Sequence, residues 1–304
     1  MRHLPDNHVS PRTLVSPPVS DSPVRHHFTV DVEEYFQVAA LEPFVPRSSW
    51  EERSSRLDVG MRRVLELLAA RDVRATFFVL GWIAQRHPAL VRELAAAGHE
   101  VASHGWGHER VTTLTREEFR ASIRDSKRAL EDLSGVAVLG YRAPSFSIVR
   151  GGEWALDILV EEGYRYDSSL FPVRRSGYGF AGGARDPYRL ERAAGGLDEL
   201  PPATLELGSA VVPAGGGAYF RLFPYEMVRS AFTRAERRGV PATFYIHPWE
   251  LDPDQPRLDV PLATRIRHYG GLRGTVARLQ RLLGEFQFQP IAETLGLGHA
   301  VVAR

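Results

Sequence analysis

Seven polar side chains stand at or just past the C-terminal end of segments that the sequence predicts to be strands. They are Asp31, Glu33, His104, His108, Arg142, Asp167 and His247. In a βα barrel the active site is built at that end of the strands. Because the position is shared by several segments, it indicates a site more strongly than any of these residues alone.

Two histidines four residues apart follow the predicted strand 100–103. In the segment Ser-His-Gly-Trp-Gly-His, His104 and His108 could bind one metal ion, and the glycines permit a tight turn between them. Taken alone the pattern is weak, because two surface histidines would also give it. A catalytic zinc ion usually has three protein ligands and one open position, so a third ligand is needed.

Carboxylates near the first predicted strand supply candidates for that ligand. Asp31 and Glu33 point the same way in an extended segment, since side chains alternate with a period of two. Two carboxylates on one face are costly unless a cation or a shared proton offsets them. A metal ion would resolve this, with one carboxylate as ligand and the other as base. A solvated acidic loop is the alternative interpretation of this segment.

Arg142 and His247 complete the candidate set. An arginine can hold a carboxylate through paired hydrogen bonds, although Arg142 could also be an ordinary surface residue. A histidine at the rim of a metal site is a natural general acid, although a lone histidine at a strand end is more often a satisfied core residue. Nearby aromatic side chains could stack on sugars or simply pack in the core: Trp106, Tyr219, Phe220 and Trp249.

The elements that must position these residues alternate along the chain. Strands are expected at 27–32, 76–80, 100–103, 138–142, 165–168 and 242–247, and helices at 58–71, 88–97, 115–133, 153–162, 225–238 and 274–284. Such βα units predict a mainly parallel sheet, either a barrel or a doubly wound sheet. Residues 172–222 are expected to be a long excursion, either a lid or the rim of an open groove. No G-x-G-x-x-G or P-loop supports nucleotide binding.

Composition excludes several classes of function. The chain has 304 residues, 43% of them apolar, and a formal charge of +1, so nothing in its net charge favours nucleic acid or an acidic membrane. The absence of cysteine excludes disulfides, thiolate metal sites and a cysteine nucleophile. No apolar stretch approaches the roughly 20 residues of a membrane span. Residues 1–26 carry no signal-peptide pattern and are expected to be a disordered tail before one domain at 27–304. A cytoplasmic location is expected, with the periplasm as the alternative.

Together the motifs resemble a known family. Thr-Val-Asp31, Ser-His104 with His108, Tyr-Arg142-x-Pro144 and Ile-His247-Pro are similar to the signature of the NodB-like polysaccharide deacetylases, carbohydrate esterase family 4, over roughly residues 28–295. A narrower resemblance is to deacetylases of exopolysaccharide loci tied to the exosortase/PEP-CTERM system. That resemblance is carried by the segments 28–38, 167–172, 217–224 and 247–252.

The resemblance implies a distorted (β/α)₇, TIM-like barrel that removes N-acetyl groups from an amino-sugar oligo- or polysaccharide. It implies one divalent ion, zinc first, with Co²⁺, Mn²⁺ or Ni²⁺ as alternatives. It makes Asp31 the base, His104 and His108 metal ligands, Arg142 the tether of the base, His247 the general acid and Asp167 the residue that orients it. Val32 stands where most members have the third ligand, so Glu33 is expected to replace it, with Glu34 as the competitor. Expected substrate contacts are Tyr141, Pro144, Trp106, Tyr219, Arg221 and Trp249.

Two other functions stay open at this point. One is a small-molecule amidohydrolase that acts on cyclic ureides or imides on the same fold, which a lidded pocket would favour. The other is a sugar-binding module without catalysis, which the presence of both a base and an acid candidate argues against. The sequence indicates neither the polymer nor the oligomeric state.

Overall fold

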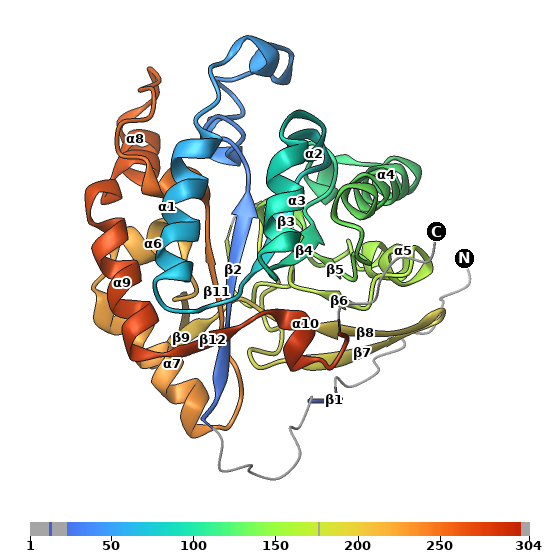
Figure 1. Ribbon diagram of the computed structural model, residues 1–304. Helices are drawn as coiled ribbons and strands as arrows, with labels where there is room; N and C mark the ends of the chain where they lie inside the picture. Colours follow the sequence, from blue (N-terminus) through green and yellow to red (C-terminus); the bar gives the residue numbers. More distant parts are fainter. Residues whose placement is uncertain (1–11, 14–22, 176, 299–304) are drawn as a thin grey trace.

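The computed structural model describes residues 12–13, 23–175 and 177–298 (Figure 1). A ten-stranded sheet runs in the order β1-β7-β8-β6-β5-β4-β3-β2-β11, and β12 also pairs with β2. Its strands are β1 (Arg12–Thr13), β2 (Arg25–Val32), β3 (Thr76–Val79), β4 (Glu100–Ser103), β5 (Gly140–Tyr141), β6 (Tyr166–Asp167), β7 (Tyr188–Arg192), β8 (Gly195–Glu199), β11 (Thr243–Ile246) and β12 (Gln287–Gln289). A separate hairpin consists of β9 (Thr204–Leu207) and β10 (Ala210–Pro213).

The parallel strands form a ring. β11, β2, β3, β4, β5, β6 and β8 pair in parallel, each with the next. Beyond β8, Pro202 makes a parallel bridge to Thr243 of β11, and the Ala203 N–H donates to the Thr243 carbonyl at 2.9 Å. These contacts join the two ends of the parallel series, in agreement with the expected seven-stranded, distorted barrel.

Helices follow most of the ring strands and lie outside them (Figure 1). The α-helices are α1 (Leu57–Ala69), α2 (Gly81–Arg86), α3 (Pro88–Ala96), α4 (Arg116–Ser134), α5 (Trp154–Glu161), α6 (Gly217–Leu222), α7 (Tyr225–Arg237), α8 (Leu262–Tyr269), α9 (Thr275–Glu285) and α10 (Ile291–Thr294). Short 3₁₀ turns are η1 (Ala39–Leu41), η2 (Arg47–Glu52), η3 (Val111–Thr113), η4 (Pro144–Phe146), η5 (Pro248–Leu251) and η6 (Leu272–Gly274). Among the described residues, no helix is long and apolar enough to cross a bilayer.

The packing of β2 shows how the strand aims its carboxylate. Phe28, Val30 and Val32 belong to the main apolar cluster, which also contains the buried side chains of α1. Thr29 and Asp31 have the opposite parity and both contact Arg142 inside the ring. Burial of the three apolar residues therefore fixes the register that turns Asp31 inward.

Two expectations about segments need correction. The stretch 172–222 is not only an excursion, because it contains β8, a member of the parallel ring, and β7, which pairs antiparallel with β8. The proposed tail lies largely outside the described residues, at 1–11 and 14–22. Its boundary at residue 26 falls inside β2, which begins at Arg25 and buries His26 completely.

Candidate functional site

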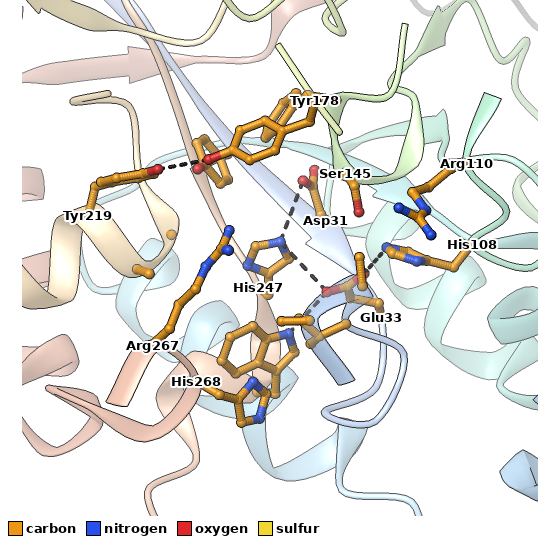
Figure 2. A pocket seen from close by; sticks show the side chains of 18 of the residues that line it. Asp31, Glu33, His108, Arg110, Ser145, Tyr178, Tyr219, His247, Arg267 and His268 are labelled. Carbon is orange, nitrogen blue, oxygen red and sulfur yellow. Dashed lines mark hydrogen bonds and ion pairs between the residues drawn. The ribbon is translucent and has the colours of Figure 1, made fainter. Parts of the chain in front are cut away.

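A cavity of about 280 Å³ lies where β2, β4 and β11 end (Figure 2). Eight of the side chains expected from the sequence line it: Asp31, Glu33, His104, His108, Tyr219, Arg221, His247 and Trp249. The topology thus brings together residues as distant in sequence as Glu33 and Trp249, which are 216 positions apart. Strands of a parallel ring make this possible because their C-terminal ends meet at one rim.

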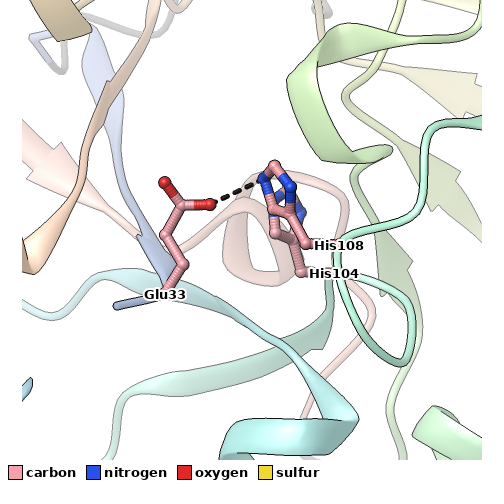
Figure 3. Close-up of side chains that lie close together, drawn as sticks. All are labelled: Glu33, His104 and His108. Carbon is pink, nitrogen blue, oxygen red and sulfur yellow. Dashed lines mark ion pairs between the residues drawn. The ribbon is translucent and has the colours of Figure 1, made fainter. Parts of the chain in front are cut away.

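Glu33, His104 and His108 form a candidate metal centre (Figure 3). Their ligand atoms all lie within 4.8 Å of one another. Oε2 of Glu33 is buried, and His108 Nε2 lies 2.7 Å from it. One carboxylate and two imidazoles are a donor set that suits zinc and similar divalent ions. The convergence of the three ligand atoms and the chemistry of the donor set both fit a bound cation, and Glu33 rather than Glu34 contributes to this set.

Local backbone conformation presents the two histidines. His104 follows β4 directly, and its Nδ1 lies 2.8 Å from the Arg142 carbonyl oxygen, so Nδ1–H donates there and Nε2 keeps its lone pair for a metal. Gly105 has φ +77°, which agrees with the tight turn expected after His104. His108 is itself left-handed at φ +64°, a conformation that costs energy outside glycine. Burial lowers the pKa of His104 to about 4, so the imidazole is neutral at pH 7.

Glu34, the competing candidate for the third ligand, is engaged outside the metal centre. Its carboxylate accepts from the Arg56 backbone N–H at 3.1 Å and from the Ser55 hydroxyl. Arg56 directly precedes the first residue of α1, so Glu34 satisfies a backbone donor at the start of that helix. Both oxygens of Glu34 are therefore occupied by a structural task.

Asp31 is held on one side by Arg142. The fully buried guanidinium donates through Nη1 to Asp31 Oδ1 at 2.7 Å and to Thr29 Oγ1 at 2.7 Å. Ser168 fixes the rest of the guanidinium, accepting at Oγ from Nη2 (2.8 Å) and at its carbonyl from Nε (3.2 Å). Oδ2 of Asp31 is turned toward His247, at 3.8 Å from Nε2. One carboxylate oxygen is thus committed to orientation, and the other is left to accept a proton.

His247 is oriented by Glu250, not by Asp167. Both residues belong to the turn that begins directly after β11, where Glu250 Oε1 lies 2.7 Å from His247 Nδ1 and accepts from the His247 N–H at 3.1 Å. Arg221 donates from Nε to the other oxygen of Glu250 at 2.5 Å, and both side chains are fully buried. His247 Nε2 therefore faces the cavity, 3.7 Å from Glu33 Oε1.

Charge sets the protonation of His247. Burial lowers its pKa, but the carboxylates of Glu33, Glu250 and Asp31 outweigh burial and raise the pKa to about 9. Burial would likewise raise the pKa of Glu33, yet His108, His247 and His104 together lower it to about 2. At neutral pH the site therefore holds an imidazolium beside carboxylates, which is the state that a general acid requires.

Asp167 lies elsewhere in the ring. Its carboxylate accepts from the Ser169 hydroxyl at 2.6 Å and from the Ser169 N–H at 3.2 Å. Burial raises its pKa to about 6 and, with Asp167 close by, raises the pKa of Glu199 well above its ordinary value. Because Ser169 Oγ in turn accepts from the Ala143 N–H at 2.7 Å, Asp167 supports the backbone beside Arg142. The expectation that Asp167 orients His247 is wrong in this structure.

The aromatic candidates divide by position. Trp249 lines the cavity, but its ring stacks on His247 and on His268, each at an interplanar angle of 20°, and its Nε1–H donates to Glu33 at 3.1 Å. It therefore holds the site rather than offering an open face to a sugar. Trp106, Tyr141 and Pro144 do not line the cavity. The Tyr141 ring is buried against Phe119.

Several lining residues were missed from the sequence. They are Arg110, Ser145, Tyr178, Tyr245, Arg267 and His268. Most come from loops and from α8, whereas site residues were sought from the sequence only at the ends of predicted strands. Glu250 was also missed, although its spacing in His-Pro-Trp-Glu matches a capping pattern that could have indicated it.

Two family models match the chain in adjacent segments. Residues 58–163 match the family described as "Polysaccharide deacetylase", and residues 168–296 match "Domain of unknown function (DUF3473)". Among curated proteins, a peptidoglycan deacetylase of Helicobacter pylori is 31% identical over 115 residues, 37% of this chain and 38% of the relative. A chitooligosaccharide deacetylase of Rhizobium leguminosarum bv. trifolii is 35% identical over 114 residues, 38% of this chain and 49% of the relative.

Solved structures support the fold over almost the whole chain. A putative polysaccharide deacetylase from Mycobacterium smegmatis has a TM-score of 0.60 at 22% identity and covers 96% of this chain and 99% of its own. Puue allantoinase has a TM-score of 0.57 at 17% identity, covering 92% and 96%. The sequence matches span less than half the length of the two curated relatives. They support the resemblance to the NodB-like polysaccharide deacetylases, whereas the structural likeness shows the fold alone.

Proposed function

We propose that this protein is a metal-dependent hydrolase that removes N-acetyl groups from the amino-sugar residues of a saccharide chain. The main observation in support is that three groups face one cavity. They are the candidate metal centre, the Asp31 carboxylate held by Arg142 and the His247 imidazolium held by Glu250. The family match over residues 58–163 and the names of the two curated relatives support the same reaction.

Each residue has a distinct task in the proposed reaction. Glu33, His104 and His108 would hold the ion, which supplies Lewis acidity to the acetamide carbonyl when bound. Asp31 accepts the proton of the attacking water at Oδ2, while Arg142 keeps Oδ1 in place. His247 donates its Nε2 proton to the departing amine nitrogen, and Glu250 keeps the ring oriented by accepting from Nδ1–H. The products are acetate and a free amino sugar.

Release of acetate tests this proposal. The metal-stripped protein, the zinc-reloaded protein and the reloaded Asp31→Asn variant are each incubated with N-acetylglucosamine oligomers and with cyclic ureides. We expect acetate from the oligomers only with the reloaded wild type. Turnover of ureides alone would instead favour the small-molecule amidohydrolase, and saccharide binding without any turnover would favour a non-catalytic module.

The narrower resemblance leads us to propose an exopolysaccharide as the physiological polymer. It is supported by the segments 217–224 and 247–252, which supply Tyr219, Arg221 and Glu250 to the site. Comparison of acetate release from isolated exopolysaccharide and from peptidoglycan would test it. Release from peptidoglycan alone would contradict it.

A further inference from the structure

The cations that line the cavity are paired with carboxylates, with one exception. Arg110 Nη2 lies 2.7 Å from Glu42, Arg221 Nε lies 2.5 Å from Glu250, and His247 Nδ1 lies 2.7 Å from Glu250. Arg267 also lines the cavity, yet its guanidinium has no hydrogen bond or ion pair within the part of the chain that the structure describes. The cavity lining thus includes one arginine, itself exposed to solvent, whose charge no described carboxylate offsets.

The backbone of Arg267 is anchored although its side chain is free. Its carbonyl oxygen accepts from Arg221 Nη2 at 2.9 Å, and the carbonyl of Gly270, three residues on, accepts from Arg221 Nη1. Because Arg221 is fully buried and paired with Glu250, the end of α8 is fixed relative to His247. Figure 2 shows the guanidinium reaching from this anchor into the cavity, beside His247 in this view.

A pair of phenols stands on the same side of the cavity. Tyr178 and Tyr219 line it, and their hydroxyl oxygens are 2.7 Å apart (Figure 2). Arg175 Nε donates to the Tyr219 oxygen at 3.1 Å. The two phenols have one hydroxyl hydrogen each, and the hydrogen bond between them uses one of the two. The other is left to donate to a ligand, whichever phenol carries it.

We propose that this corner, made of Arg267, Tyr178 and Tyr219, binds a carboxylate on the sugar next to the one that is deacetylated. A guanidinium with a phenolic O–H is a donor set that matches a carboxylate better than a neutral hydroxymethyl group. The inference rests on the proposed function and narrows it: the substrate is an acidic polymer that contains N-acetylated amino sugars. In Figure 2, Glu33 and His108 lie on one side of His247 and the corner lies on the other, so the acetamide would be bound at the first and the acid at the second.

A matched pair of tetrasaccharides tests this. One alternates N-acetylglucosamine with glucuronic acid, and the other is the same compound with each carboxyl group reduced to a hydroxymethyl group. A third probe, an N-acetylglucosamine oligomer with lactyl ether carboxylates, distinguishes a uronic acid from an acidic substituent on the amino sugar. Acetate release and calorimetric binding are measured for the zinc-loaded wild type, Arg267→Gln and Arg265→Gln. Arg265 is the control because it is, like Arg267, an exposed arginine of α8, but it does not line the cavity.

We expect the wild type to prefer the acidic tetrasaccharide about fivefold or more in kcat/KM, mainly through KM, with a smaller preference at high salt. Arg267→Gln should abolish the preference, and Arg265→Gln should keep it. The proposed carboxylate site would be refuted if the wild type used the two tetrasaccharides equally. It would also be refuted if Arg267→Gln kept an undiminished preference for the acidic one. If no saccharide released acetate, the proposed function would be refuted instead. The binding measurement would still decide whether the carboxylate is recognised.

Discussion

Replacement of Glu250 by glutamine should move the alkaline limb of the pH–rate profile to lower pH. Glutamine keeps an oxygen that can accept from His247 Nδ1–H, so the ring orientation is preserved while the negative charge is lost. That charge is one of three that keep the pKa of His247 at about 9 against the effect of burial. Without it, burial opposes only Glu33 and Asp31, and the imidazolium loses its proton at a lower pH.

The size of the shift follows from the geometry. A carboxylate in direct hydrogen-bond contact changes the pKa of its partner by about 1–3 units, or roughly 1.4–4 kcal/mol. We therefore expect the alkaline limb to fall by about 1–3 pH units, with activity near pH 6 much less affected. The substitution also leaves Arg221 buried without its carboxylate, which should cost about 3–5 kcal/mol of unfolding free energy. Addition of Arg221→Met removes that buried charge and should restore part of the stability but not the limb.

Steady-state acetate release between pH 5 and pH 10 measures the limb, and denaturant unfolding measures the stability. Asp167→Asn is the matched comparison, because the family resemblance implied Asp167 in this role. It should leave the alkaline limb in place, since its carboxylate contacts Ser169. If Asp167→Asn moved the limb and Glu250→Gln did not, the assignment of Glu250 as the residue that positions His247 would be refuted.

Three further predictions concern the metal, the base and the core. The double variant His104→Ala/His108→Ala should lose stoichiometric metal in elemental analysis, and full retention would contradict the centre. Asp31→Asn should lower kcat about 10²–10⁴-fold with metal content unchanged, because it removes the base and not a metal ligand. Burial lowers the pKa of His26 to about 4 from an ordinary 6.5, so the unfolded chain binds the proton more readily and stability falls as pH drops below 6.5. Wild type should lose about 2 kcal/mol more than His26→Asn between pH 7.5 and pH 5 in denaturant unfolding, and equal losses would exclude His26 as the cause.

The sequence predicted best where burial fixes a pattern. Strand parity predicted that Asp31 and Glu33 point the same way, and both line the cavity, while Phe28, Val30 and Val32 are buried in the main apolar cluster. The helix expected at 115–133 is α4, whose start carries a capping box formed by Thr115 and Glu118, which the sequence Thr-Arg-Glu-Glu indicates, and Gly135 is left-handed beyond its last residue. Such features depend on residues a few positions apart, so one segment is enough to reveal them.

The partners of the site were harder to predict because they depend on distant segments. Asp167 and Glu250 both stand near strand ends, and the family resemblance implied Asp167, the last residue of β6, as the partner of His247. Only the fold shows that Asp167 faces Glu199, 32 positions away, whereas Glu250 is three residues from His247 and its capping pattern could have been recognised. The contact between Arg221 and Arg267 could not be predicted from the sequence. In it, the buried Arg221 side chain of α6 donates to the backbone carbonyl of Arg267 in α8.

The site is assembled from three stretches of the chain, and this determines how the family matches can be used. The segment that matches polysaccharide deacetylases supplies His104, His108 and Arg142. His247 and Glu250 lie in the segment that matches a family of unknown function, and Asp31 and Glu33 precede both matches. Trp249, in the second matched segment, contacts the stretch that precedes both matches, because its indole N–H donates to Glu33. Its ring also stacks on His247. Neither matched segment therefore contains a base, a metal centre and an acid, and the proposed reaction has to be tested on the whole chain.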